Sequence, residues 1–511
     1  MNDPVPDDFP LFWLKNGVIG AGGPLRRRFA GLYSAPRALP VILAAGILLA
    51  VVTACVSPPP TELPGPEVPV ETAPEPGPAV EEPPHTRAIL EKVADLLAWN
   101  DFDGALALFD QIDPVEAATL DIRLLKASIL SSAGRLDEGR AIVNDILSGD
   151  TENPEALFVL AALEGADGRE REQRTILERI IKVNPRHVNA LTELGTLALR
   201  GQSYRTAGSY FDRALAVEPE NGNALIGRAA VYRYNRESKQ AELLLNQAVK
   251  LYPEWEVPLS ERARLYRGAG YPNLALNDLD RAKSLDPDNY WIRCDRGNVL
   301  IDLNRKQEAL EEFQQAIALE PQNFLAYVYA AGIKDELGNF DGAEQDYETL
   351  IKLRPDYYFA FEGLGMHKMR KHLWGEARDA FLEAYGKAPS ETSYALLGTV
   401  NWMRAGKPAD PRKFLETALR KVQRDTLDWY MLRLFYDMSG DTDVAMRIDR
   451  EKNPAAKAKM LFYLAQFYDI RGNITLANRF FLQVKELGQR GMPEWRLNEW
   501  ILAERNLKID Q

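Results

Sequence analysis

The residues best suited to chemistry are few and widely separated along the chain. The 511-residue sequence has two cysteines, Cys55 and Cys294, and four histidines. The cysteines do not form the closely spaced pairs typical of zinc sites, and two of them cannot build a disulfide framework. His367 and His372 are five residues apart, so they would not share one face of a helix. This distribution predicts no metal and no cofactor.

Common catalytic motifs are also absent from the sequence. It has no HExxH motif, no phosphate-binding P-loop and no GxSxG elbow. The net charge of −12 argues against a general nucleic-acid binder, which would need a basic face. We therefore expect that the protein is not an enzyme and has no nucleic-acid partner.

The Cys55 thiol is the exception, because of the segment that precedes it. Four arginines lie upstream of the apolar run "PVILAAGILLAVVTA", which spans residues 40–54. A positive flank, a short apolar stretch and small residues are typical of a secretory signal. The run is shorter than the ~20 residues that a membrane-spanning helix needs.

The sequence Val52-Thr53-Ala54-Cys55 resembles the lipobox of bacterial lipoproteins. The resemblance implies cleavage before Cys55 and lipidation of its thiol, so that acyl chains such as palmitate anchor the protein to a membrane. Val56 stands where an aspartate would favour retention in the inner membrane, so the resemblance favours the outer membrane, facing the periplasm. The alternative is an uncleaved single span that keeps the Cys55 thiol in the membrane.

A spacer is expected after the cysteine. Ser57–Pro84 contains eleven prolines and six glutamates, and neither lysine nor arginine. Such a composition cannot bury a core, and proline holds the chain extended. We interpret this segment as a linker that separates a membrane anchor from a folded domain.

From about residue 86 the chain repeats itself every 34 residues. A large apolar residue stands eight positions before most of the periodic prolines, and small residues stand five, twelve and 24 positions before them. The prolines are Pro185, Pro219, Pro253, Pro287, Pro321, Pro355 and Pro389. This period, with these columns, resembles the tetratricopeptide repeat over residues from about 86 to 490.

The resemblance implies an all-α fold, a right-handed superhelical solenoid of about twelve helix-turn-helix repeats with a C-terminal capping helix. Small residues let paired helices approach, proline ends the second helix, and stacking buries the apolar faces. The expected parts are a signal peptide or membrane-targeting segment (1–54), a lipidated cysteine and linker (55–85), degenerate N-terminal repeats (86–187), regular repeats (188–391), degenerate C-terminal repeats (392–490) and the capping helix (491–511).

Members of this family bind partners in a concave groove lined by the first helix of each repeat. The groove positions of this chain include Arg233, Tyr234, Arg264, Arg267, Trp291 and Asn298. Arginine can donate paired hydrogen bonds to carboxylates, and an aromatic ring can anchor an apolar side chain. The alternative is that these residues form ordinary solvated surface. The lysine–asparagine set with which some relatives clamp a terminal carboxylate is not matched.

These features predict a membrane-anchored protein–protein interaction scaffold of the bacterial cell envelope. It would bind a protein or peptide partner in its groove and help to assemble envelope machinery. One alternative is a small-molecule- or lipid-binding accessory protein of a transporter or secretion system, and another is an envelope enzyme with a site built by the repeats. The step from fold to role is an analogy, because repeat folds serve many functions.

Replacing Cys55 with serine should abolish metabolic labelling with palmitate, because serine lacks the thiol that receives the lipid. The uncleaved precursor should accumulate and migrate more slowly on a gel. Cys294→Ser is the matched control and should be labelled like the wild type. Unchanged labelling and mobility of Cys55→Ser would rule out the lipoprotein hypothesis.

Overall fold

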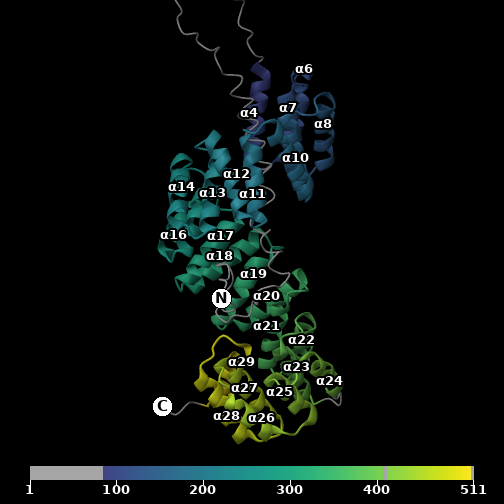
Figure 1. The fold of residues 1–511 in the computed structure, drawn as a ribbon, viewed down its shortest axis with the longest axis vertical. Helices are drawn as coiled ribbons and strands as arrows, with labels where there is room; N and C mark the ends of the chain where they lie inside the picture. Colours follow the sequence, from purple (N-terminus) through teal and green to yellow (C-terminus); the bar gives the residue numbers. More distant parts are fainter. Residues whose placement is uncertain (1–83, 100, 407–410, 508–511) are drawn as a thin grey trace, which may run out of the picture. The chain divides into compact units, whose positions relative to one another are not determined.

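The computed structural model describes residues 84–99, 101–406 and 411–507 (Figure 1). This part of the chain consists of helices joined by short turns and contains no strand. The helices are α4 (Pro84–Ala98), α5 (Phe102–Leu108), η1 (Phe109–Gln111), α6 (Pro114–Ala117), α7 (Leu120–Ser132), α8 (Leu136–Gly149), α9 (Pro154–Ala166), α10 (Glu170–Val183), α11 (Val188–Arg200), α12 (Tyr204–Val217), α13 (Gly222–Tyr234), α14 (Ser238–Leu251), α15 (Glu256–Gly268), α16 (Pro272–Leu285), α17 (Tyr290–Asp302), α18 (Lys306–Leu319), α19 (Phe324–Glu336), α20 (Phe340–Leu353), α21 (Tyr358–Arg370), α22 (Trp374–Lys387), α23 (Thr392–Arg404), α24 (Arg412–Lys421), α25 (Leu427–Asp437), α26 (Asp441–Arg450), α27 (Pro454–Ile470), α28 (Ile474–Leu487) and α29 (Pro493–Glu504). The predicted all-α solenoid of helix-turn-helix repeats is confirmed.

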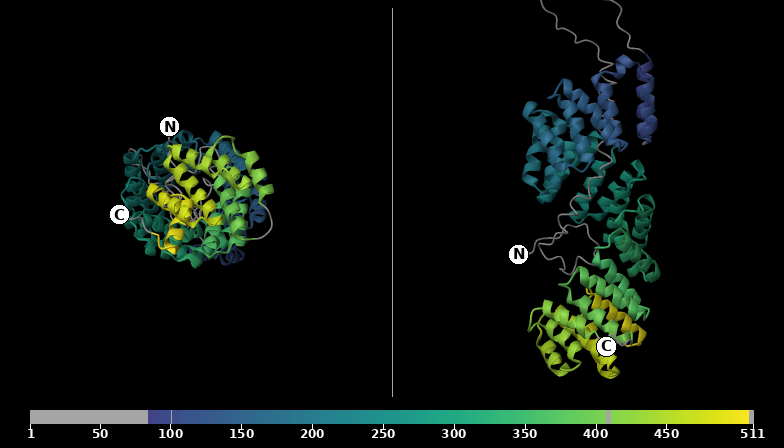
Figure 2. Two further views of the ribbon diagram at one scale, coloured as in Figure 1. Left: turned by 90° about the horizontal axis from the view of Figure 1, so that it is seen from below. Right: turned by 90° about the vertical axis from the view of Figure 1, so that its right-hand side faces the viewer.

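The described helices divide into two compact units between Pro253 and Glu254. One unit contains α4 to α14, and the other contains α15 to α29. Within each unit, successive helices pair into hairpins such as α11/α12 and α21/α22, which Figure 2 shows from two further directions. Among the described helices, none combines the length and the apolar composition of a membrane span. Cys55 and nearly all of the predicted linker lie outside the described residues, so their roles stay predictions.

The ends of the helices follow from residues that recur with the repeat. Asn221, Asn289 and Asn323 stand two residues after periodic prolines, and each caps the first helix of a hairpin with its side-chain oxygen. The turn inside each hairpin contains a residue with positive φ, which suits the end of a helix. These residues lie 34 apart, at Gly134, Gly168, Gln202, Arg236, Gly270, Asn304, Gly338, His372 and Gly406. One register therefore extends at least from residue 134 to residue 406.

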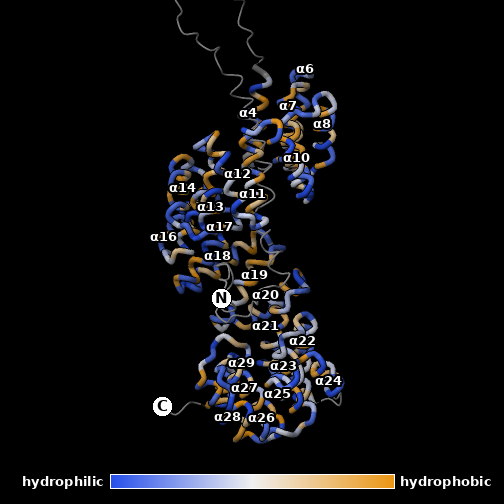
Figure 3. The backbone as a smooth tube through the Cα atoms, in the orientation of Figure 1, coloured by the Kyte–Doolittle hydropathy of each residue, from blue (hydrophilic) through white to orange (hydrophobic). Residues whose placement is uncertain are grey.

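A large apolar side chain from each regular second helix, an aromatic ring in most of them, sets the spacing of the first helices. Phe211 of α12 is fully buried. A Cβ atom added at Gly195 of α11 would lie 2.7 Å from this ring, and one added at Gly227 of α13 would lie 2.3 Å from it. Phe211 therefore fills the space between the first helix of its own hairpin and that of the next. Apolar and polar positions alternate along the helices so that one side of each can be buried in this way (Figure 3).

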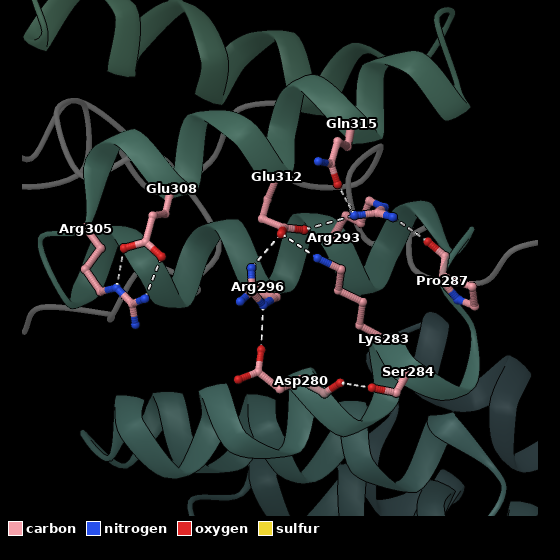
Figure 4. Close-up of polar contacts among 10 residues, drawn as sticks. All are labelled: Asp280, Lys283, Ser284, Pro287, Arg293, Arg296, Arg305, Glu308, Glu312 and Gln315. Carbon is pink, nitrogen blue, oxygen red and sulfur yellow. Dashed lines mark hydrogen bonds and ion pairs between the residues drawn. The ribbon is translucent and has the colours of Figure 1, made fainter.

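A buried carboxylate fixes α17 between its neighbours in the second unit. Glu312 of α18 lies 2.8 Å from Lys283 of α16, and 3.4 Å and 2.5 Å from Arg293 and Arg296 of α17 (Figure 4). Its side chain is only 5% exposed, so ionisation would be costly without these three cations. The cluster joins two hairpins and orients the helix that carries Trp291 and Asn298.

Replacing Ala309 with leucine should destabilise the unit that contains α18 by about 1–3 kcal/mol, because the added carbons would overpack a helix crossing. Ala309 is fully buried in the crossing of α18 with its neighbours. Ala318→Leu is the matched control, since Ala318 is exposed on the same helix. Urea denaturation followed by circular dichroism measures both variants. Equal midpoints for the two would contradict this account of the packing.

Candidate functional site

In the unit formed by residues 84–253, Arg233 and Tyr234 end the first helix α13. The Arg233 guanidinium carbon lies 4.7 Å from the centre of the Tyr234 ring. Tyr234 in turn stacks on Tyr204, with 4.9 Å between ring centres and 17° between planes. The Tyr234 side chain remains partly open to solvent, so this stack offers a flat apolar surface beside a cation.

In the unit that begins at residue 254, the two predicted groove arginines bind carboxylates of the neighbouring hairpin. Arg264 of α15 pairs with Asp295 of α17 at 2.7 Å, and it also pairs with Glu261 on its own helix. Arg267 pairs with Asp302 of α17 at 2.6 Å. Both guanidinium groups therefore connect consecutive first helices, and part of their hydrogen-bonding capacity is already used.

Trp291 and Asn298 both lie on α17 in the same unit. The Trp291 ring meets the edge of the Tyr290 ring, with 5.1 Å between centres. Asn298 is buried, and its Oδ1 atom accepts no hydrogen bond in the structure. The structure therefore brings Arg264, Arg267, Trp291 and Asn298 onto α15 and α17, the first helices of consecutive hairpins. That these residues bind a partner stays a prediction.

The last hairpins close on themselves in a way that the repeat pattern does not predict. In a simple stack, a repeat contacts only the repeats next to it. Here α27 packs on α23, and α29 packs on α21 as well as on α27 and α28 (Figure 1). A single apolar core then extends from Met366 to Leu502. The C-terminal helix caps the last hairpin and also covers first helices of earlier ones.

Buried polar groups hold α29 in place. Glu494 is almost fully buried, and its Oε1 atom accepts hydrogen bonds from Ser393 Oγ at 2.5 Å and from Tyr463 Oη at 2.7 Å. Arg496 Nη1 donates to Asp335 Oδ2 at 3.2 Å. Because a buried carboxylate needs partners, these bonds specify the position of the helix more closely than apolar contact alone would.

The Asp335 carboxylate also binds groups from two further positions. Tyr347 Oη donates to Asp335 Oδ2 at 2.8 Å, and His367 Nε2 lies 2.6 Å from Asp335 Oδ1. The His367 ring also lies near Trp500 of α29, with 5.9 Å between centres. The His367 side chain is buried, and the sequence gives no sign of this pairing with an aspartate 32 residues earlier.

Glu362 is a second buried carboxyl group close to α29. Burial, helped by the nearby charge of Glu494, raises the pKa of Glu362 to about 8. A hydrogen bond from Tyr394 Oη opposes the shift in part. The Glu362 Oε1 atom has no hydrogen-bond partner. At neutral pH the folded protein therefore holds this carboxyl group mainly in its protonated form.

The closure by α29 forms a pocket with a volume of about 630 Å³. Its walls come from five helices and from residues that flank them, and they combine aromatic rings, aliphatic side chains and arginines. The lining consists of Phe340, Met369, Arg370, His372, Trp374, Arg404, Leu497, Trp500, Ile501, Ala503, Glu504 and Arg505. A volume of this size is typical of ligand-binding clefts.

Positive charge exceeds negative charge around this pocket. Arg404 and Arg505 both bind the buried carboxylate of Asp469, at 2.5 Å and 2.7 Å. Among the residues that the structure describes, Arg370 has no carboxylate within ion-pair distance. Its guanidinium carbon instead lies 3.9 Å from the centre of the Phe340 ring. Glu504, the acidic residue of the lining, lies 3.2 Å from His372.

None of the pocket residues was among the predicted groove residues. The terminal helix was expected from its apolar stripe, but its partners lie far away in the sequence. Ser393 and Glu494 are 101 residues apart, and Asp335 and Arg496 are 161 residues apart. The available signal was the pair of tryptophans in residues 493–508, because two large amphipathic rings on one short helix can serve more than one contact surface.

The tetratricopeptide repeat family matches the chain at residues 292–323, and also at 173–224, 192–254 and 333–392. The repeats predicted from the 34-residue period are therefore confirmed. No curated protein matches the chain.

Solved structures with similar folds include that of the APC/C hetero-tetramer Cut9–Hcn1, with 19% identity and a TM-score of 0.46. That likeness covers 62% of this chain and 63% of the other, so it spans less than two thirds of either. A tetratricopeptide repeat protein from Parabacteroides merdae is 22% identical over 48% of this chain and 96% of its own, with a TM-score of 0.37. YrrB, described as a TPR protein with an unusual peptide-binding site, is 21% identical over 36% of this chain and 95% of its own, with a TM-score of 0.29. Because these TM-scores lie below 0.5, no function is carried over from the three structures.

The stability of the C-terminal hairpins should fall as the pH rises from about 5 to 8. In this range the unfolded chain has already released the proton of Glu362, whose ordinary pKa is near 4.5, whereas the folded chain retains it. The expected loss is about 1.4 kcal/mol for each pH unit. Glu362→Gln cannot titrate, so its free energy of unfolding should depend less on pH.

Thermal unfolding measured at several pH values tests this expectation. Glu348→Gln is the matched control, because Glu348 is exposed on α20 in the same unit. The control should follow the wild-type pH dependence. A pH dependence of Glu362→Gln that equals that of the wild type would contradict the assigned protonation state.

Proposed function

We propose that these tetratricopeptide repeats form a membrane-anchored protein–protein interaction scaffold of the bacterial cell envelope. The observation that carries the proposal is the match of the repeat family to several segments of a chain built from stacked hairpins. Tetratricopeptide repeat proteins generally bind protein or peptide partners, and repeats of this kind are generally not catalytic. The partner would help to assemble or organise envelope machinery.

The surfaces available for a partner support this role. The first helices α15 and α17 present arginines, carboxylates and Trp291 side by side, and the pocket under α29 adds aromatic rings and further arginines. Arginine and aromatic residues dominate the binding energy of many protein interfaces. We propose that the partner contacts both the first helices of this unit and the pocket.

Anchoring and location rest on the sequence. The apolar run of residues 40–54 and the lipobox-like residues that end in Cys55 support a lipidated N-terminus. Val56 supports the outer membrane, facing the periplasm. In this proposal the Pro/Glu-rich linker spaces the repeats from the membrane so that they can reach a partner.

The pocket favours one second candidate function, an accessory protein that binds a small molecule or a lipid for a transporter or secretion system. Its volume of about 630 Å³ and its aromatic walls would suit such a ligand. Native mass spectrometry of the purified chain distinguishes the two functions. A stoichiometric small molecule supports the carrier, and a stoichiometric protein supports the scaffold.

Affinity purification of the full chain from detergent-solubilised membranes of its native cells should recover a stoichiometric protein partner. Exchanging the charges of one groove pair, as Arg264→Asp together with Asp295→Arg, should lower that recovery by about tenfold. The exchange keeps an ion pair between α15 and α17 but moves the guanidinium group to the next helix.

The matched control exchanges Arg228 of α13 and Asp212 of α12, which form a 2.7 Å pair between consecutive hairpins of the other unit. Circular dichroism verifies that each variant is folded. Equal recovery with both exchanges would remove Arg264 from the binding surface. A wild-type chain that recovers no protein would overturn the scaffold itself.

A further inference from the structure

We propose that the pocket between α29 and the helices α20 to α23 binds an acidic peptide segment that also carries aromatic or apolar side chains. A carboxylate of the peptide would bind Arg370, and a neighbouring apolar side chain would contact the rings of Phe340, Trp374 and Trp500. This inference rests on the proposed function as a scaffold and names the chemistry of the partner.

The excess of positive charge around the pocket favours binding of a negatively charged group. Arg404 and Arg505 share the single carboxylate of Asp469, and Glu504 lies beside His372. Among these groups, the three arginines of the lining carry one more charge than the carboxylates of Asp469 and Glu504, even with a neutral histidine. In a chain whose net charge is −12, a local positive excess attracts an acidic partner specifically to this place.

Arg370 is the group best able to bind the incoming carboxylate. Its guanidinium group stacks on Phe340 at 3.9 Å and lies 5.9 Å from the centre of the Trp500 ring. Stacking holds the plane of the group while its N–H donors remain available at the edge. Asp341 is the acidic residue nearby, but it pairs with Lys371 at 2.8 Å. A carboxylate from a partner can therefore accept two parallel hydrogen bonds from Arg370.

A buried donor on the opposite wall also lacks an acceptor. Arg404 Nε is buried and makes no hydrogen bond, although the Nη2 atom of the same residue binds Asp469 and Gln466. The Arg404 guanidinium carbon lies 5.2 Å from the centre of the Trp374 ring, so donor and apolar surface adjoin here as well.

The remaining walls are apolar, so they fit an apolar side chain next to the carboxylate of the peptide. Met369, Leu497 and Ile501 line the pocket together with the three aromatic rings. About 630 Å³ accommodates a few side chains but not a folded element. A nucleic acid would need a basic stripe along its backbone rather than one narrow, partly apolar cavity. A short peptide that combines acidic and apolar residues fits both parts of the surface.

Fluorescence anisotropy with the purified full chain in detergent tests the proposal. The probe is a fluorescein-labelled octapeptide in which glutamate and phenylalanine alternate, with both ends blocked. The control probe has glutamine in place of glutamate. The acidic probe should bind at least about tenfold more tightly than the control, and its affinity should fall as the salt concentration rises.

Variants of Arg370 connect this binding to the pocket. Arg370→Gln should weaken binding of the acidic probe by about tenfold, and Arg370→Lys should weaken it less, because lysine keeps the charge but loses the planar fork. Arg370 is exposed, so both variants are expected to fold, which circular dichroism verifies. Arg420→Gln is the matched control, since Arg420 is exposed on α24 and lies outside the pocket lining. It should bind like the wild type.

Several results would overturn the inference. Equal affinity for both probes, or equal affinity of Arg370→Gln and the wild type, would remove the carboxylate site. Tight binding of free 3-phenylpropionate that displaces the peptide at equal concentration would indicate a small-molecule site instead. If neither probe binds while affinity purification still recovers a protein partner, the pocket inference fails and the scaffold proposal stands.

Discussion

Each regular hairpin inserts one large apolar side chain between two first helices, and the stack depends on this contact. Phe211 shows why, because it lies against glycine positions on the first helix of its own hairpin and on that of the next. One side chain therefore fixes both the spacing inside a hairpin and the spacing between hairpins. Dispersion contacts at such close range are lost quickly when the helices separate, so the small residues are required on both sides.

This constraint leaves the outward face of each first helix available for polar chemistry. In the second unit that face is used for bonds within the chain, where Arg264 and Arg267 reach carboxylates one hairpin further on. A partner that binds there must compete with these pairs or complete their unused hydrogen-bonding positions. The pocket under α29 differs, because Arg370 stacks on the ring of Phe340 and does not pair with a carboxylate of the described chain.

Contacts within a repeat and between neighbouring repeats could be predicted from the sequence, because the residues that make them recur every 34 positions. The prolines, the small residues and the large apolar residues specified the hairpins and their order. Turn residues with positive φ give the same register, even where Gln202, Arg236, Asn304 or His372 replaces glycine. The closure of α29 onto α21 could not be predicted, because curvature accumulates from small rotations at each crossing. The sequence shows the acidic residues Asp295 and Asp302, but it does not show that they pair with the groove arginines.

The position of α29 has a consequence for the order in which the chain folds during its synthesis. The ribosome makes α29 after the hairpins that it covers, and the helix contacts side chains such as Asp335 that were made 161 residues earlier. Domains form during synthesis from the N-terminal end, so the earlier hairpins keep a partly uncovered surface until α29 has been made. A chain interrupted before α29 would stack its earlier hairpins and still lack the pocket, because α29 supplies one of the pocket walls.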